Sequence, residues 1–284
     1  MKLPMTIAVR GGRTLLLLLC AAAGTILLVR FAPGFFSDER ELDANYAGVV
    51  RTDVEAENRQ QSLESIAVRE VKGWIHGDFG ESRQYRVPVA ELLGARVRIS
   101  AWLLLQGIGY GWLLAVGAAL PLSAVGKSSI VWGLPFTVLL AVPTAAMATA
   151  CILADTGGPV LVLSLLIAAR EFKFLRSLLE GAWRAPHLMQ GRAQGLSGPA
   201  LIRIHILPNI LPQLGALTTL SIVTALGAVI PIEVIFTVPG VGQLAWAAVM
   251  NRDLPVLVAV SLLMALVVGL AGLLSTRNIP LEAT

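Results

Sequence analysis

Residue types that could do chemistry are present in this chain but scattered along it. A glycine, a lysine and a serine follow one another at Gly126, Lys127 and Ser128, as at the end of a phosphate-binding loop. The phosphate-binding motif needs a glycine five residues before Gly126, where this chain has Pro121. The motif also follows a β-strand, whereas an apolar helix is expected before Gly126 in this chain. We therefore expect no nucleotide binding at this position.

The histidines and cysteines do not form a recognisable site either. His76, His187 and His205 are far apart in the sequence, and none is spaced with other ligands. An active site needs a nucleophile with its base, or clustered ligands, at one place. We expect no catalytic residues, no metal site, no cofactor and no enzyme activity. Cys20 and Cys151 lie in apolar blocks and are predicted to be small core residues rather than a disulfide.

Composition places the chain among membrane proteins. Its 284 residues are 56% hydrophobic and only 14% charged, whereas soluble domains contain about 25% charged residues. Apolar blocks cover both halves, which predicts one integral unit surrounded by membrane lipid. The net charge of +4 comes from arginines spread between these blocks. No basic stripe is interleaved with aromatic residues, so no nucleic-acid partner is expected.

Apolar blocks predict six transmembrane helices. They cover residues 14–29, 101–120, 130–154, 160–169 with its flanks, 211–236 and 256–274. The first could be a cleaved signal peptide, but no clean cleavage site follows it, so we expect a retained helix. Gly107, Gly109 and Gly111 would allow close helix contact in the second block. Pro135 and Pro143 predict kinks in the third.

The fourth block is short and ends in charged residues. A bilayer core needs about 20 helical residues, so this helix must begin near Thr156. Its charged end contains Arg170, Glu171 and Lys173. Either these side chains reach back to the headgroups, or they face protein along an inner vestibule.

Loop charges predict the orientation. Most lysines and arginines of the short loops fall on the side of both termini, which places the termini in the cytoplasm; the short loops of the other side contain only Arg252. Residues 1–36 form the cytoplasmic N-terminus and first helix, and residues 37–98 a polar extracytoplasmic segment. Residues 99–284 then form a five-helix core with a cytoplasmic loop at 176–209.

That cytoplasmic loop has the pattern of a bent elbow. A helix, a break at Gly195 and a second helix would make a compact turn, because glycine accepts positive φ. Pro199 suits the first turn of the second helix, and Pro208 suits a bend at re-entry. Small Ala193 would let a partner approach closely. An ordinary solvated loop remains the alternative.

Four stretches, in order along the chain, resemble ABC importer permeases of the dipeptide, oligopeptide and nickel branch. They are residues 30–34, 77–93, the elbow, and 233–255. The elbow residues similar to the coupling loop of that branch are Gly191, Arg192, Ala193, Gln194, Gly195, Leu196, Leu207 and Pro208. The family's Glu-Ala-Ala positions are lost, since Met189, Gln190 and Gly191 stand there.

The resemblance implies an all-α membrane protein with the ABC importer permease fold and six transmembrane helices. It implies a subunit of the bacterial-type inner membrane that imports peptides or related small solutes by alternating access. Its partners would be a second permease subunit, two ABC ATPase subunits that bind the coupling helix, and an extracytoplasmic solute-binding protein. The rival interpretation is a non-transporting scaffold or assembly subunit with a degraded permease fold.

The last of the four stretches contains the candidates for an outer loop or gate. They are Glu233, Phe236, Pro239, Gly240, Gly242, Arg252 and Asp253. An ionisable group at membrane depth is a functional candidate, so Glu233 could gate the path. Alternatively, its carboxylate anchors the backbone of residues 237–242. Arg252 and Asp253 are predicted to order the outer loop.

Overall fold

The computed structural model describes residues 78–82, 84–124, 130–193, 195–251 and 253–275, together with Gly12, Leu16, Cys20, Gly24 and Gly73. The first predicted helix and the polar segment before residue 78 therefore lie largely outside the described residues, as do Lys127 and His76. The described part is helical apart from an isolated β-bridge between Glu81 and Pro88.

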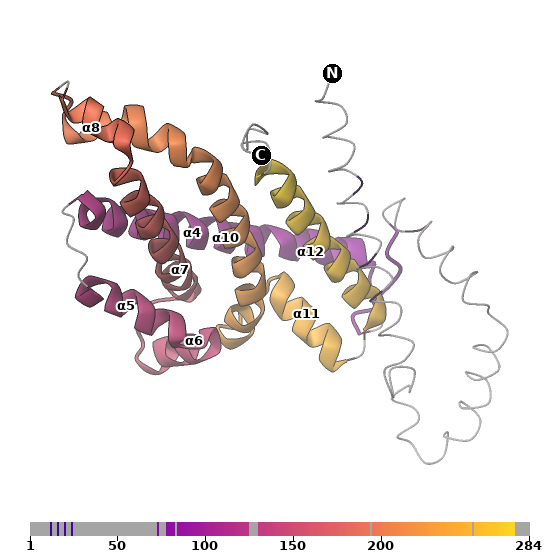
Figure 1. Ribbon diagram of the computed structural model, residues 1–284. Helices are drawn as coiled ribbons and strands as arrows, with labels where there is room; N and C mark the ends of the chain where they lie inside the picture. Colours follow the sequence, from indigo (N-terminus) through magenta and orange to yellow (C-terminus); the bar gives the residue numbers. More distant parts are fainter. Residues whose placement is uncertain are drawn as a thin grey trace, which may run out of the picture.

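The helices pack as one bundle, with long helices crossing it and short ones at its two ends (Figure 1). In chain order they are α4 (Val89–Ala124), α5 (Ile130–Ala141), α6 (Thr144–Leu153), α7 (Pro159–Trp183), α8 (Pro186–Ala193), α9 (Gly198–Leu201), the π-helical turn η2 (Ile202–Ile206), α10 (Leu207–Ile235), α11 (Val241–Met250) and α12 (Leu254–Ser275).

Three helical segments are long and apolar enough to cross a membrane. They are Val89–Ser123 in α4, the continuous run Gly198–Ile235 that ends in α10, and Leu254–Gly272 in α12. The predicted second, fifth and sixth helices are thereby confirmed. A bent pair can count as a fourth span, so the full number of six is not reached within the described residues.

The bent pair is the third predicted block. Gly133–Ala141 and Thr144–Leu153 meet at an angle of 99°. The break falls at Pro143, whose extended backbone (ψ 139°) and missing N–H end the helix before it. The kink predicted there is confirmed. Pro135 lies inside α5 without ending it, so the kink predicted at that proline stays a prediction.

The fourth block forms α7, which starts at Pro159 and continues through the charged residues to Trp183. Among the described helices it packs most extensively with α4. Two glycines of α4 make this possible, because a Cβ at Gly107 would lie 2.4 Å from Leu163 and one at Gly111 would lie 2.7 Å from Ile167. A Cβ at Gly109 would meet no atom within 4 Å, so the close helix contact predicted at this residue is wrong.

The three charged residues at this end of α7 differ in which of the two predicted alternatives they fit. Glu171 is fully buried, so it faces protein rather than headgroups. Arg170 is half-buried and donates to the Thr224 hydroxyl of α10. Lys173 is exposed.

Apolar clusters divide the core along the bundle. The central cluster includes Leu163, Ile167, Val229 and Ile232. A second cluster surrounds Phe172 and Leu179 of α7 and reaches Leu188, Leu201 and Ile206. A third joins the first turns of α4 to α11 and α12, through Val89, Leu93, Val241, Leu244 and Val256. Because α4 starts in the third cluster and ends in the second, these two mark opposite ends of the molecule.

Two features of the loops were not expected from the sequence. The Gly- and Pro-rich segment between the last two long helices contains the ten-residue helix α11. In addition, the helix does not end at Pro208, because the chain passes through η2 directly into α10. The Leu207 N–H donates to the Ile202 carbonyl, and this longer π-type spacing keeps the helix continuous next to a proline that has no N–H.

Candidate functional site

The elbow, defined as residues 186–208, protrudes at one end of the bundle (Figure 1). Its break falls at Gly195, whose φ of +77° lies in the left-handed region that glycine adopts at little cost. The Leu196 N–H closes the turn by donating to the Gly191 carbonyl at 3.2 Å. Pro199 occupies the first turn of α9. Both conformational predictions are confirmed.

The underside of the elbow is tightly packed. Leu188, Leu201 and Ile206 are buried there against α7. Gly191 is buried too, and a Cβ at this position would lie 2.7 Å from the Leu201 side chain and 3.3 Å from the His205 ring. α8 therefore packs directly on α9 and η2.

The rim of the elbow faces away from the protein. Ala193 and Gly195 are exposed, and so are Leu207 and Pro208 further along the chain. The described residues exclude Gln194 and the side chain of Arg192. The elbow thus presents small residues and an exposed backbone turn on a packed apolar base.

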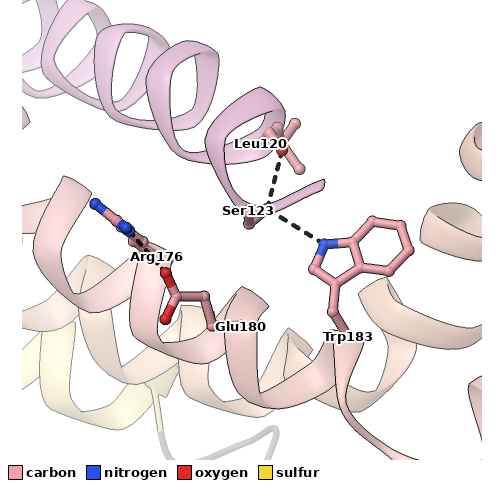
Figure 2. A network of polar contacts seen from close by, with 5 residues as sticks. All are labelled: Leu120, Ser123, Arg176, Glu180 and Trp183. Carbon is pink, nitrogen blue, oxygen red and sulfur yellow. Dashed lines mark hydrogen bonds and ion pairs between the residues drawn. The ribbon is translucent and has the colours of Figure 1, made fainter. Parts of the chain in front are cut away.

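The base of the elbow is tied to α4 through polar contacts that sequence reasoning missed (Figure 2). Trp183, the last residue of α7, donates its indole N–H to the Ser123 hydroxyl at 3.2 Å. Ser123 is buried and donates in turn to the Leu120 carbonyl at 2.9 Å. On α7, Arg176 and Glu180 form an ion pair at 2.8 Å. The sequence feature that could have indicated this contact was a tryptophan at the end of a helix, next to a loop.

A second polar site, the loop anchor, lies at the opposite end of the bundle. Glu233 is fully buried near the end of α10. Its Oε2 accepts the Gly242 N–H at 2.7 Å and the Gln243 N–H at 3.2 Å, both from the first turn of α11. The Ser100 hydroxyl of α4 donates to Oε1 at 2.5 Å and accepts the Val241 N–H at 2.7 Å. The anchoring contact predicted for Glu233 is present.

Glycines of the loop make room for this carboxylate. A Cβ at Gly240 would lie 2.2 Å from Glu233 Oε1, and one at Gly242 would lie 2.8 Å from the Ile230 Cα. A carboxylate that accepts the free N–H groups of a helix start also complements the positive end of the helix dipole. Among the other candidates, Phe236 is half-buried and Pro239 is exposed.

Asp253 connects the same loop to the segment before α4. It is fully buried, and its Oδ2 accepts hydrogen bonds from the Ser82 hydroxyl and from the Gln84 N–H, the latter at 3.2 Å. That Asp253 orders the outer loop stays a prediction, and Arg252 lies outside the described residues. Sequence reasoning missed Ser82 and Ser100, because serines far from the loop carry no signal of their partner.

Comparison with known proteins identifies the class of this architecture. Residues 103–278 match the family described as binding-protein-dependent transport system inner membrane component. The metal-staphylopine import system permease protein CntB of Staphylococcus aureus is 31% identical over 107 residues, which cover 38% of this chain and 34% of that protein.

Two further relatives align over more of the chain. The glutathione transport system permease protein GsiC of Salmonella choleraesuis is 27% identical over 213 residues, covering 68% of this chain and 69% of that protein. The dipeptide transport system permease protein DppB of Lactococcus lactis is 28% identical over 165 residues, covering 58% of this chain and 52% of that protein.

The fold has a counterpart among solved structures. A chain of the MetNI methionine ABC transporter, in an inward-facing conformation, superposes with a TM-score of 0.55 at 17% sequence identity. The superposition covers 66% of this chain and 94% of that one. Since the family match spans more than half of the sequence, the chain belongs to the binding-protein-dependent transport system inner membrane components, the permeases of ABC transporters.

Proposed function

We propose that this chain is the permease subunit of an ATP-driven importer, and that its elbow is the surface on which an ATPase subunit docks. The observation that carries the proposal is the geometry of the elbow. It combines a rigid apolar base with an exposed rim around Gly195, which lies at positive φ. Such a knob needs no chemistry of its own, because shape and polar rim contacts suffice for docking.

The mechanism follows from how the elbow is attached. α7 leads into it and α10 leads out, and both helices run through the bundle. A displacement of the elbow therefore moves two long helices as rigid bodies, which is the form of motion that alternating access requires. ATP hydrolysis then takes place on separate ATPase subunits, and a second permease subunit completes the path.

The solute class is proposed from the relatives. The proteins named above are permeases of a metal-staphylopine import system, a glutathione transport system and a dipeptide transport system. We therefore propose small peptides or compounds like them as the cargo. An extracytoplasmic solute-binding protein would deliver it to the end that carries the loop anchor. The named permeases favour this function over the scaffold.

The orientation belongs to the same proposal. Both termini and the elbow lie on the cytoplasmic side, and residues 37–98, the last ten of which already belong to α4, enter the bundle from outside. In support, the end of α4 at Ser123 meets the base of the elbow, whereas its start meets the loop anchor.

Cysteine cross-linking tests the proposal directly. Ala193→Cys, on the exposed rim, is introduced after Cys20 and Cys151 have been replaced by alanine, and a short bifunctional reagent is added to membranes that contain the whole transporter. We expect an ATPase subunit to be captured. Thr156→Cys is the matched control, because this residue is also exposed but lies in the turn at the far end of α7. If Ala193→Cys captures no nucleotide hydrolase, or both cysteines capture it equally, docking at the elbow is wrong.

A further inference from the structure

A carboxyl group that neither the elbow nor the loop anchor uses lies buried inside the bundle. Glu171, in the middle of α7, has no exposed surface. Its Oε1 lies 2.8 Å from the hydroxyl of Ser221 on α10, which is also fully buried. Its Oε2 is buried without a hydrogen-bond partner among the described residues. The protonation state of this group therefore has structural consequences.

The surroundings of Ser221 are unusual, because three polar groups converge on one hydroxyl. The Trp112 indole N–H of α4 lies 3.0 Å from it and can only donate. The Leu217 carbonyl lies 3.0 Å from it and can only accept. Glu171 Oε1 is the third neighbour. A serine hydroxyl has one hydrogen to donate and two lone pairs that accept.

Counting donors and acceptors decides between the two forms of the carboxyl group. If the serine hydrogen goes to Leu217, the lone pairs accept from Trp112 and from a third donor, which only a protonated Glu171 can be. All three contacts are then hydrogen bonds. If Glu171 is ionised, both Glu171 and Leu217 are acceptors that compete for a single hydrogen, and one contact is lost.

One nearby charge, that of the preceding residue Arg170, attracts an ionised Glu171. Arg170 donates instead to the Thr224 hydroxyl, and no described cation forms an ion pair with Glu171. The helices α5 and α6, packed on α7, contain no charged residue. The charged residues of α4 lie in its first turns, and the one in α10 is Glu233 at the far end. An ionised, unpaired carboxylate here would be strongly disfavoured.

We infer that Glu171 is held as a neutral acid that donates a hydrogen bond to Ser221, and that it is a positioning residue which sets α7 against α4 and α10. Through Ser221 one carboxyl hydrogen joins the three helices, and Trp112 completes the junction. Because α7 leads directly into the elbow, this junction aligns the helix that carries the elbow. That last step rests on the proposed function, whereas the protonation state does not.

Infrared spectroscopy of the purified full-length protein tests the protonation state without any ATPase or solute. The C=O stretch of a protonated carboxylic acid is well separated from the carboxylate bands. We expect the difference spectrum between wild type and Glu171→Gln at neutral pH to show the loss of a protonated-acid band. Glu180→Gln is the control, because this partly exposed glutamate pairs with Arg176 and should lose a carboxylate band. Loss of a carboxylate band in Glu171→Gln would overturn the inference.

The positioning role has its own readout in a conservative rescue. Glutamine keeps a hydrogen-bond donor at position 171, whereas Glu171→Met keeps only the length of the side chain. We expect Gln to match wild type in the equilibrium constant of unfolding in detergent, and Met to raise that constant about threefold to tenfold, the range of single hydrogen bonds between membrane helices. Glutamine and methionine variants that are equally stable would refute the positioning role. This comparison, too, is independent of whether the elbow binds an ATPase.

Discussion

The elbow and the loop anchor lie at opposite ends of the same helices and are built by different interactions. At the anchor, the buried carboxylates of Glu233 and Asp253 accept hydrogen bonds from backbone N–H groups and serine hydroxyls. At the elbow, the rim residues Ala193 and Gly195 are exposed, and the shape depends on a glycine turn above apolar packing. At the anchor, buried carboxylates pair with donors from several helices, whereas the rim of the elbow stays exposed.

This contrast separates two mechanical tasks. Buried hydrogen bonds are directional, and leaving them unmade is costly, so they suit a loop that must stay in one place. Apolar packing beneath an exposed turn fixes a shape but leaves its rim free. A change at the anchor should therefore affect stability first, and a change at the elbow should affect docking first.

The largest expected effect is on docking, from Gly195→Arg. The arginine side chain would project from the exposed turn into the ATPase, and the residue would have to adopt positive φ, at a local cost of about 1–2 kcal/mol. We expect the protein to remain in the membrane while solute-stimulated ATP hydrolysis of the complete transporter is abolished. Gly195→Asn is the control, because asparagine tolerates this conformation and is small. Normal transport by the arginine variant would contradict docking at this turn.

The next largest effect is on stability, from Glu233→Ala. The substitution leaves the Gly242 and Gln243 N–H groups and the Ser100 hydroxyl without their acceptor. We expect a loss of about 3 kcal/mol in the free energy of unfolding in detergent, since each buried donor left unpaired costs about 1–3 kcal/mol and the terms overlap.

Glu233→Gln distinguishes anchoring from gating. An amide oxygen still accepts both N–H groups, so we expect a loss of about 1 kcal/mol and normal transport if anchoring is the whole role. Failure of transport by a stable Glu233→Gln protein would instead support a gate. Cross-linking of the ATPase at the elbow should persist in both Glu233→Ala and Glu233→Gln. Its loss would show that the loop anchor and the elbow do not act independently.

The smallest effect is expected at the base of the elbow, from Trp183→Phe. The ring is kept, but the hydrogen bond to Ser123 is removed, which should reduce the free energy of unfolding by about 1 kcal/mol. Ser123→Ala should have a similar effect, and the double variant should add little to either. Thr149→Ala is the matched control, because its hydroxyl bonds only within its own helix. If the losses in free energy of unfolding for Trp183→Phe and Ser123→Ala were fully additive in the double variant, the two side chains would not interact energetically.

Much of the architecture could be predicted because it depends on local patterns. Apolar blocks long enough for a bilayer predicted the helices that became α4, α10 and α12. The break at Pro143 and the positive φ of Gly195 follow from the restricted or permissive backbones of those residue types. Even the anchoring role of Glu233 was foreseeable, since a carboxylate just before a Gly-rich loop has few other partners.

What could not be predicted depends on residues distant in the sequence. Ser100 lies opposite Glu233, and Ser82 opposite Asp253, only because α4 starts where α11 and α12 do. α11 itself was missed because its apolar residues follow a Gly-Pro pattern typical of loops, and it is stabilised by packing in the third cluster. The burial of Glu171 was one of two open alternatives until α10 was placed beside α7.

The amino-acid sequence by itself determined the membrane class, most of the long helices and the conformation of the elbow, because side-chain hydropathy and backbone restrictions act over neighbouring residues. Only the tertiary structure decided which buried carboxyl groups meet backbone N–H groups and which meets a single serine. Those pairings join helices that the sequence separates by many turns, and burial removes the water that would otherwise satisfy each group.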